Sequence, residues 1–600
     1  MRNAIGSQNQ RAPKAGGERE ATVIDTLPKF PMEPRVSQFQ LRLRRTTCRS
    51  WLIAGAWLLI APISRLQAAP SNVSFAQSTP TVEAYDFVEV TLTVAGPDAR
   101  NPFTDVEVEG QFGKAGTSES IRTDGFCDSA DGSLFRIRFM PVTPGEYSYT
   151  VTYRQGGFVK GYTANFQAVS GNRRGIVRVD PDYRWHFIWE ATREHYFWNG
   201  TTAFLMMGWQ DEKVITGIID RLHALKVNRI RVMLAARLAS YWGEPVVPTS
   251  DFHVCLNPWL AERPDDVSNP GFDYSRFNLG YWQKYERMLR YAREKDMIIS
   301  VVFDWNDSKV HPTAGGEDEQ RYFRYTVARL APFSNVTWDL GDDITAYRNE
   351  EWAHLMGTLL KKWDAYNHLA TNHPNSDREI LDRKSDWLDF TSFQRWWRPL
   401  HGFMLAQREQ QAKSGRIIPQ TDEEYGYEDH YPKGSSKAYP DGQTADANRR
   451  AAWEMSMAGT YQTTGETAKR GTGIWPDTGG GWINGRGDES MVMLQGYSHM
   501  VDFFTSFEWW KAEPHDEWVN NGAMCAAEPG RLYVVYLPMG GGSATLKCAP
   551  GRYQANWFNP RTGRSFPIPL VETTGLWTSP FAPDSGDWAI LLRAVSEVSK

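Results

Sequence analysis

Cysteine is scarce in this chain, and the common cysteine and histidine motifs are missing. The 600 residues contain five cysteines, without a C-x-x-C or an H-E-x-x-H spacing. These absences exclude the usual structural zinc sites and the zinc proteases. Cys525 and Cys548 flank one predicted strand pair, and the sequence leaves open whether they form a disulfide or stay free thiols.

Signatures of nucleophilic serine and of phosphate binding are missing too. Ser414, Ser456 and Cys255 lack the context of a nucleophile elbow. The glycine-rich segment 478–482 lacks the Gly-Lys-Ser/Thr ending of a phosphate loop, so we interpret it as a mobile loop over a site. We therefore expect neither a metal nor an organic cofactor.

Long basic runs are also missing. Residues 1–69 carry 11 Lys and Arg against 4 Asp and Glu, so the remainder is more acidic than the formal net charge of −5 suggests. This distribution argues against nucleic acid as a partner.

The apolar run 51–63 is too short for a comfortable transmembrane helix. Several arginines precede it and small residues follow, the order of an export signal. The sequence predicts a secreted or periplasmic protein without stable membrane insertion after cleavage. An uncleaved segment would make it membrane-anchored.

Three folded domains are expected after this N-terminal extension of residues 1–69. Residues 70–172 alternate with period two between turn signals, which predicts an immunoglobulin-like β-sandwich. Residues 176–508 show about eight alternations of strand and amphipathic helix, which favour a (β/α)8 TIM barrel. Residues 509–600 return to β character and predict a C-terminal β-sandwich.

Two acidic clusters follow predicted barrel strands. Asp343 ends the stretch 335–343, and Glu424 lies in the stretch 417–428. Glycosidic hydrolysis needs one carboxylic acid and one carboxylate at the site, which in this fold lies beyond the carboxyl ends of the strands. We interpret Asp343 and Glu424 as this pair, with Asp342 and Glu423 as their close rivals.

Polar and aromatic residues around the same strand ends are candidates for sugar binding. Trp is abundant, with 25 residues, and aromatic faces stack on sugar rings. The candidates are Asp304, Trp305, Asp342, His373, Gln394, Trp396, Trp397, Tyr427 and Glu428.

At these motifs the chain resembles the apiosidase-like (β/α)8-barrel glycoside hydrolases, in the subgroup with an N-terminal immunoglobulin-like domain of unknown function. The segment 272–282 and the two acidic stretches carry the resemblance, with Leu340-Gly341-Asp342-Asp343 and Asp422-Glu423-Glu424 at their centres. Segment 557–563 resembles a C-terminal β-sandwich labelled in this family as collagen-binding, and we infer no collagen binding from that label.

The resemblance implies a retaining hydrolase of a polysaccharide or oligosaccharide. Asp343 falls on the family's acid/base and Glu424 on its nucleophile. The family's substrates are diverse, so apiose specificity does not carry over. Two other interpretations remain: a non-catalytic carbohydrate-binding or adhesion protein on a degenerate barrel, and a polysaccharide lyase.

Overall fold

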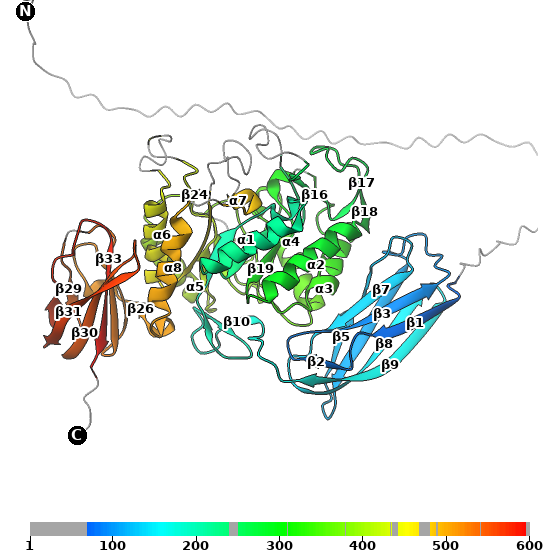
Figure 1. Ribbon diagram of the computed structural model, residues 1–600, viewed down its shortest axis with the longest axis horizontal. Helices are drawn as coiled ribbons and strands as arrows, with labels where there is room; N and C mark the ends of the chain where they lie inside the picture. Colours follow the sequence, from blue (N-terminus) through cyan, green and yellow to red (C-terminus); the bar gives the residue numbers. More distant parts are fainter. Residues whose placement is uncertain are drawn as a thin grey trace, which may run out of the picture. The chain divides into compact units, whose positions relative to one another are not determined.

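The structure is a computed structural model, and Figure 1 shows the path of its chain. It describes residues 69–238, 250–308, 310–377, 380–431, 434, 442–466, 481–487, 490–540 and 542–595. The expected export signal and residues 478–480 of the glycine-rich loop lie outside these ranges. Within them, no helix is both long and apolar enough to span a membrane.

The N-terminal domain is a sandwich of two sheets, with strand orders β1-β3-β7-β6 and β2-β9-β8-β4-β5. Side chains alternate between core and surface, as in β3, because successive strand residues point to opposite faces. The strands are Asn72–Gln77 (β1), Thr81–Glu83 (β2), Val88–Ala95 (β3), Val106–Lys114 (β4), Ser120–Asp124 (β5), Phe126–Cys127 (β6), Leu134–Phe139 (β7), Gly145–Gln155 (β8) and Phe158–Val169 (β9).

Eight parallel strands form the barrel, in the order β21-β20-β19-β14-β13-β25-β23-β22, which is the chain order read around a circle. The Asp389 amide before β22 donates to the Ala370 carbonyl of β21 at 2.9 Å, so the barrel is nearly closed. The strands are Asn199–Thr202 (β13), Arg229–Met233 (β14), Ile298–Val302 (β19), Val336–Asp339 (β20), Ala370–Thr371 (β21), Thr391–Phe393 (β22), Gln420–Asp422 (β23) and Tyr461–Glu466 (β25), and Tyr427–Glu428 (β24) also pairs with β25. The predicted TIM-barrel fold is confirmed.

Amphipathic helices surround these strands (Figure 1). In α1, Ile215, Ile218, Ile219 and Leu222 are buried at the spacing of one helical face. Asn or Asp side chains cap the starts of α1, α2 and α4, and a Thr caps α6. The helices are Glu212–Ala224 (α1), Leu279–Arg293 (α2), Glu317–Leu330 (α3), Glu350–Trp363 (α4), His401–Lys413 (α5), Ala445–Met457 (α6), Gly481–Asn484 (α7) and Met493–Phe504 (α8).

The strand and helix alternation is incomplete at one place. Between β21 and β22, the described residues form turns, bends and irregular segments instead of a helix. Short extra strands decorate the rest of the domain. These are Val177–Val179 (β10), Phe187–Trp189 (β11), His195–Tyr196 (β12), Ala236–Arg237 (β15), Cys255–Leu256 (β16), Trp259–Ala261 (β17) and Phe272–Phe277 (β18).

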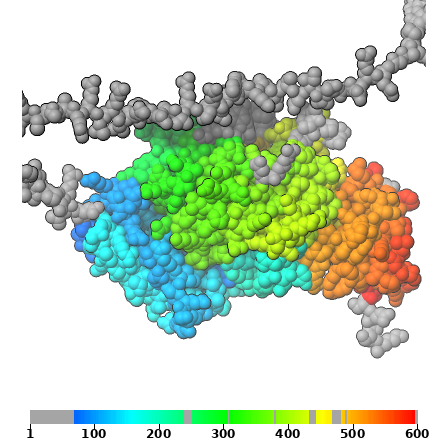
Figure 2. Space-filling model, turned by 180° about the vertical axis from the view of Figure 1, so that it is seen from behind, coloured from blue at the N-terminus to red at the C-terminus, as the bar shows by residue number. Residues whose placement is uncertain are grey.

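The C-terminal domain consists of a six-stranded antiparallel sheet, β26-β27-β28-β33-β30-β31, and the pair β29-β32. Its surface is drawn from orange to red in Figure 2. Cys525 and Cys548 are separate thiols in its core, so they form no disulfide in this structure. The strands are Glu513–Pro514 (β26), Met524–Glu528 (β27), Leu532–Leu537 (β28), Thr545–Lys547 (β29), Gly551–Asn559 (β30), Arg564–Thr573 (β31), Leu576–Thr578 (β32) and Trp588–Ala594 (β33).

A buried ion network joins the N-terminal sandwich to the barrel. Glu286 of α2 accepts hydrogen bonds from Arg138 of β7 at 2.9 Å and from Arg329 of α3 at 2.7 Å. Arg329 also pairs with Asp128, which follows β6, at 2.9 Å. All four side chains are at most 9% exposed. The sandwich is therefore attached to the outside of the barrel by ion pairs that are buried in the contact.

Candidate active site

Carboxylates from two non-adjacent barrel strands meet at the carboxyl ends of the strands. Asp342 follows β20, and Glu424 follows β23. His373 follows β21, and one oxygen or nitrogen atom of each of these three side chains lies within 4.8 Å of the others. The structure thus brings together three predicted site residues that are far apart in the sequence.

The Glu424 carboxylate is held by donors on both oxygens. Gln394 Nε2 donates to Oε2 at 2.6 Å, and the Tyr427 hydroxyl donates to Oε1. His373 Nε2 lies 3.1 Å from Oε2. Hydrogen bonds to a carboxylate favour its charged form and fix its orientation. Such a group is suited to attack an electrophilic carbon.

His373 is a neutral imidazole in this site. It is completely buried, and this burial lowers its pKa to about 3, with a further contribution from the nearby Arg231 charge. With its proton on Nε2, His373 donates to Glu424, and Nδ1 accepts from the Ser392 hydroxyl at 2.9 Å. The ring therefore orients the carboxylate without adding a positive charge.

Glu423 lies deeper than Glu424, and its carboxylate is paired inside the barrel. Its side chain is fully buried and pairs with Arg229 and Arg231 of β14. Burial alone would raise the Glu423 pKa, but the two guanidinium groups outweigh it, and the pKa is lowered. Glu424 is 5% exposed against 0% for Glu423, so Glu424 is the residue that reaches the barrel mouth.

The two aspartates after β20 have different surroundings. Asp342 is 2% exposed and accepts a hydrogen bond from Arg231 Nη2 at 2.6 Å. Burial raises its pKa, Arg231 and His373 oppose this, and Glu424 adds to it. Asp343 is partly exposed, begins a short 3₁₀ helix, and has a left-handed backbone with φ of 52°. Only Asp342 belongs to the close cluster with His373 and Glu424.

The arginines beneath this cluster were missed by the sequence reasoning. Arg229 and Arg231 are both completely buried in β14, where positions two apart point to the same side. The sequence feature that could have revealed them is a pair of arginines two positions apart in an otherwise apolar predicted strand. Arg231 also lies 3.3 Å from Asp339, whose burial raises its pKa to about 7. Asp339 therefore binds a proton more readily than an exposed aspartate does.

Asp304 and Trp305 lie beside the Asp342 backbone. The Asp342 amide donates to the Asp304 carbonyl at 2.9 Å. The Asp304 carboxylate is engaged by His311 Nδ1 at 2.5 Å, a histidine that the sequence reasoning also missed. Trp305 is only 3% exposed, so its ring offers little surface to a substrate.

Aromatic rings form one side of the mouth. Tyr427 stacks on Trp482, with ring centroids 4.5 Å apart and planes 8° apart. Trp396 meets Tyr427 edge-on at 5.3 Å, and His430 lies 5.8 Å from Trp396. Trp397 is 52% exposed. The sequence reasoning placed Trp482 in a loop over the site, whereas Gly481 and Trp482 begin helix α7. His430 was missed, because its proximity to these rings depends on contacts between different strands and helices.

Glu428 binds backbone amides instead of facing the site. Its oxygens accept from the Val492 and Met493 amides at 3.0 and 3.2 Å, at the start of α8. Burial raises its pKa to about 7, and the Glu466 charge adds to this effect. Through these contacts, Glu428 fixes the start of α8 next to Tyr427.

Asp342, His373 and Glu424 are also residue types that bind metal ions. Their atoms are close enough to share one cation. However, Arg231 donates to Asp342, and Gln394 and Tyr427 donate to Glu424. The protein therefore already supplies positive charge and hydrogen-bond donors to these carboxylates, and the arrangement is complete as a carboxylate site.

The fold is shared with solved structures. A candidate glycoside hydrolase from Bacteroides vulgatus matches with a TM-score of 0.71 and 18% identity, over 86% of this chain and all of that one. A family 5 glycoside hydrolase from the same organism matches with a TM-score of 0.55 and 17% identity, over 71% of this chain and 94% of that one. No protein of curated function matches the sequence. The fold is that of a multidomain glycoside hydrolase.

Family comparison makes the assignment more specific. Residues 81–154 match a domain family of unknown function, DUF5060. Residues 185–466 match the family described as apiosidase-like, catalytic domain. The resemblance seen in the sequence is confirmed, and the chain is an enzyme of the glycoside hydrolase class.

Proposed function

We propose that this protein cleaves an O-glycosidic bond of a polysaccharide or oligosaccharide by a retaining double displacement. The observation that carries the proposal is the Glu424 carboxylate, which three side-chain contacts orient at the barrel mouth. In this reaction Glu424 attacks the anomeric carbon and forms a glycosyl-enzyme intermediate, which water then hydrolyses.

We propose Asp343 as the acid that protonates the leaving oxygen and then the base that activates water. Its partial exposure supports this role, because the acid must reach an oxygen at the mouth. Asp342 lies deeper, and its carboxylate is already engaged by a hydrogen bond from Arg231. We assign Asp342 the positioning of Arg231 and His373 around Glu424.

The first test is a screen of the wild-type protein and Glu424→Gln against plant and microbial polysaccharides. Reducing ends and ultraviolet absorbance are read together. We expect reducing ends from the wild type alone, without new absorbance. New absorbance would indicate a lyase, and equal activity of Glu424→Gln would contradict the nucleophile assignment. Proton NMR of the first product anomer then checks retention.

The second test separates the neighbouring aspartates. Asp343→Asn and Asp342→Asn are compared on an activated aryl glycoside of the sugar identified in the screen, with and without azide. Without the acid/base, water attacks the glycosyl-enzyme intermediate slowly. Azide needs no deprotonation to attack this intermediate, so it should restore turnover in Asp343→Asn. Rescue of Asp342→Asn instead would transfer the acid/base role to Asp342.

The sequence predicts an export signal within residues 1–69. We propose that the protein is exported to the periplasm or the medium. Fractionation of cells that express the full chain, with N-terminal sequencing of the product, tests this proposal. A cytoplasmic product that retains residues 1–69 would contradict it.

A further inference from the structure

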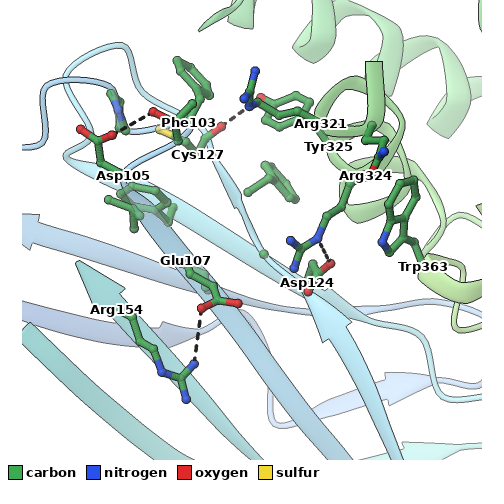
Figure 3. Close-up of a pocket in the computed structure, with 18 of the residues that line it drawn as sticks. Phe103, Asp105, Glu107, Asp124, Cys127, Arg154, Arg321, Arg324, Tyr325 and Trp363 are labelled. Carbon is green, nitrogen blue, oxygen red and sulfur yellow. Dashed lines mark hydrogen bonds and ion pairs between the residues drawn. The ribbon is translucent and has the colours of Figure 1, made fainter. Parts of the chain in front are cut away.

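A groove of about 850 Å³ lies between the N-terminal sandwich and the outer helices of the barrel, and Figure 3 shows residues that line it. One wall comes from β4, β5 and the loop 102–105 of the N-terminal sandwich. The other comes from the outward faces of α3 and α4. Its size lies within the roughly 300–1,000 Å³ typical of ligand sites. None of the predicted site residues, Glu424 included, lines this groove.

The two walls are held at a fixed distance by contacts that cross between domains. Arg324 of α3 pairs with Asp124 of β5 at 2.5 Å, as Figure 3 shows. The Tyr325 hydroxyl donates to the Cys127 carbonyl at 3.0 Å. A groove built this way exists before a ligand arrives, which reduces the entropy cost of binding.

The chemistry of the lining suits a neutral sugar. Trp363 is partly exposed, and within the described residues its ring pairs with no other aromatic ring. Aromatic faces of this kind stack on sugar rings. The lining also has as many basic as acidic side chains, namely Arg154, Arg321, Arg324 and Lys362 against Asp105, Glu107, Asp124 and Glu317. This balance offers donors and acceptors to hydroxyl groups without attracting a polyanion.

We propose that this groove is a second, non-catalytic site that binds a neutral segment of the polysaccharide substrate, with Trp363 as its stacking platform. The inference rests on the proposed function. It gives the N-terminal sandwich a role in holding the polymer near the barrel.

The test uses affinity electrophoresis of the full chain carrying Glu424→Gln, so that no polymer is cleaved. Gels contain hydroxyethylcellulose, xylan, galactomannan, arabinan or dextran. We expect at least one gel to retard the parent, and Trp363→Ala to weaken that binding about 5-fold or more. Phe581→Ala is the matched control, because this ring is 75% exposed in the C-terminal domain, and it should migrate like the parent.

Trp363→Tyr keeps an aromatic face and should retain most of the binding, and melting curves confirm that each variant is folded. In the active enzyme, Trp363→Ala should raise KM for the polymer and leave kcat unchanged. If no gel retards the parent, the groove proposal is overturned. It is also overturned if Trp363→Ala is retarded as strongly as the parent. Release of reducing ends by the wild type is a separate measurement, so failure of the groove and failure of the proposed hydrolysis are distinguished.

Discussion

The buried network between sandwich and barrel makes a quantitative prediction for Glu286→Gln. Burial alone would raise the Glu286 pKa, but Arg138 and Arg329 outweigh it and lower the pKa from 4.5 to about 2. A difference of about 2.5 pKa units corresponds to about 3 kcal/mol of stabilisation by the ionised form. Removing one charge from a buried network costs about 3–5 kcal/mol, which agrees.

The sign of the pH dependence follows from the direction of this shift. The folded pKa is depressed, so the contribution is fully present above pH 4.5, the value in the unfolded chain. It is lost as the pH falls from there towards 2. The wild type and Glu286→Gln should therefore differ by about 3 kcal/mol at pH 7, and the difference should shrink below pH 4.5.

Urea unfolding followed by tryptophan fluorescence measures this difference. With a slope of about 1–3 kcal/mol/M, the midpoint of the variant should fall by about 1 M or more. Glu212→Gln is the control, since Glu212 forms an ion pair with Arg287 on the surface and such pairs contribute about 0–1 kcal/mol. A Glu286→Gln midpoint equal to that of the control would refute the reasoning.

Three further predictions follow from local contacts. Burial raises the Glu428 pKa to about 7, so this group destabilises the fold increasingly as pH rises from 4.5 to 7. Glu428→Gln should therefore be more stable than the wild type at pH 8 and similar at pH 4, by thermal melting. Asn349 caps α4 through the Trp352 amide, so Asn349→Ala should lose about 1 kcal/mol in urea unfolding. Gln394→Leu removes a donor to Glu424 and should lower kcat/KM at least about 10-fold at neutral pH in the reducing-end assay, with an unchanged melting temperature.

Regular elements were predictable because their signals are local. The apolar spacing of 215–222 predicts one buried helical face, and the structure buries those residues in α1. The run 336–340 predicts a strand, and β20 spans Val336–Asp339. The seventh barrel strand was placed less well. The apolar pair Ile417 and Ile418 predicts this strand, but β23 begins at Gln420, because pairing with β22 and β25 sets its limits.

The loop between β21 and β22 shows where local signals were insufficient. The sequence suggested about eight strand and helix alternations, yet the described residues there contain no helix. Barrel closure constrains the strands, while the connection outside them is free to vary. This loop directly follows Asn372 and His373, so its first residues lie next to the site.

The sequence by itself determined the barrel, its flanking sandwiches and the two acidic stretches, because period, turn chemistry and motif are properties of neighbouring residues. Only the tertiary structure decided how the paired carboxylates are used. Glu423 is drawn inward by Arg229 and Arg231, while Glu424 is oriented by His373, Gln394 and Tyr427. These partners arrive from other strands and loops. Adjacent carboxylates that look equivalent in the sequence thus acquire different burial and charge partners when the barrel closes.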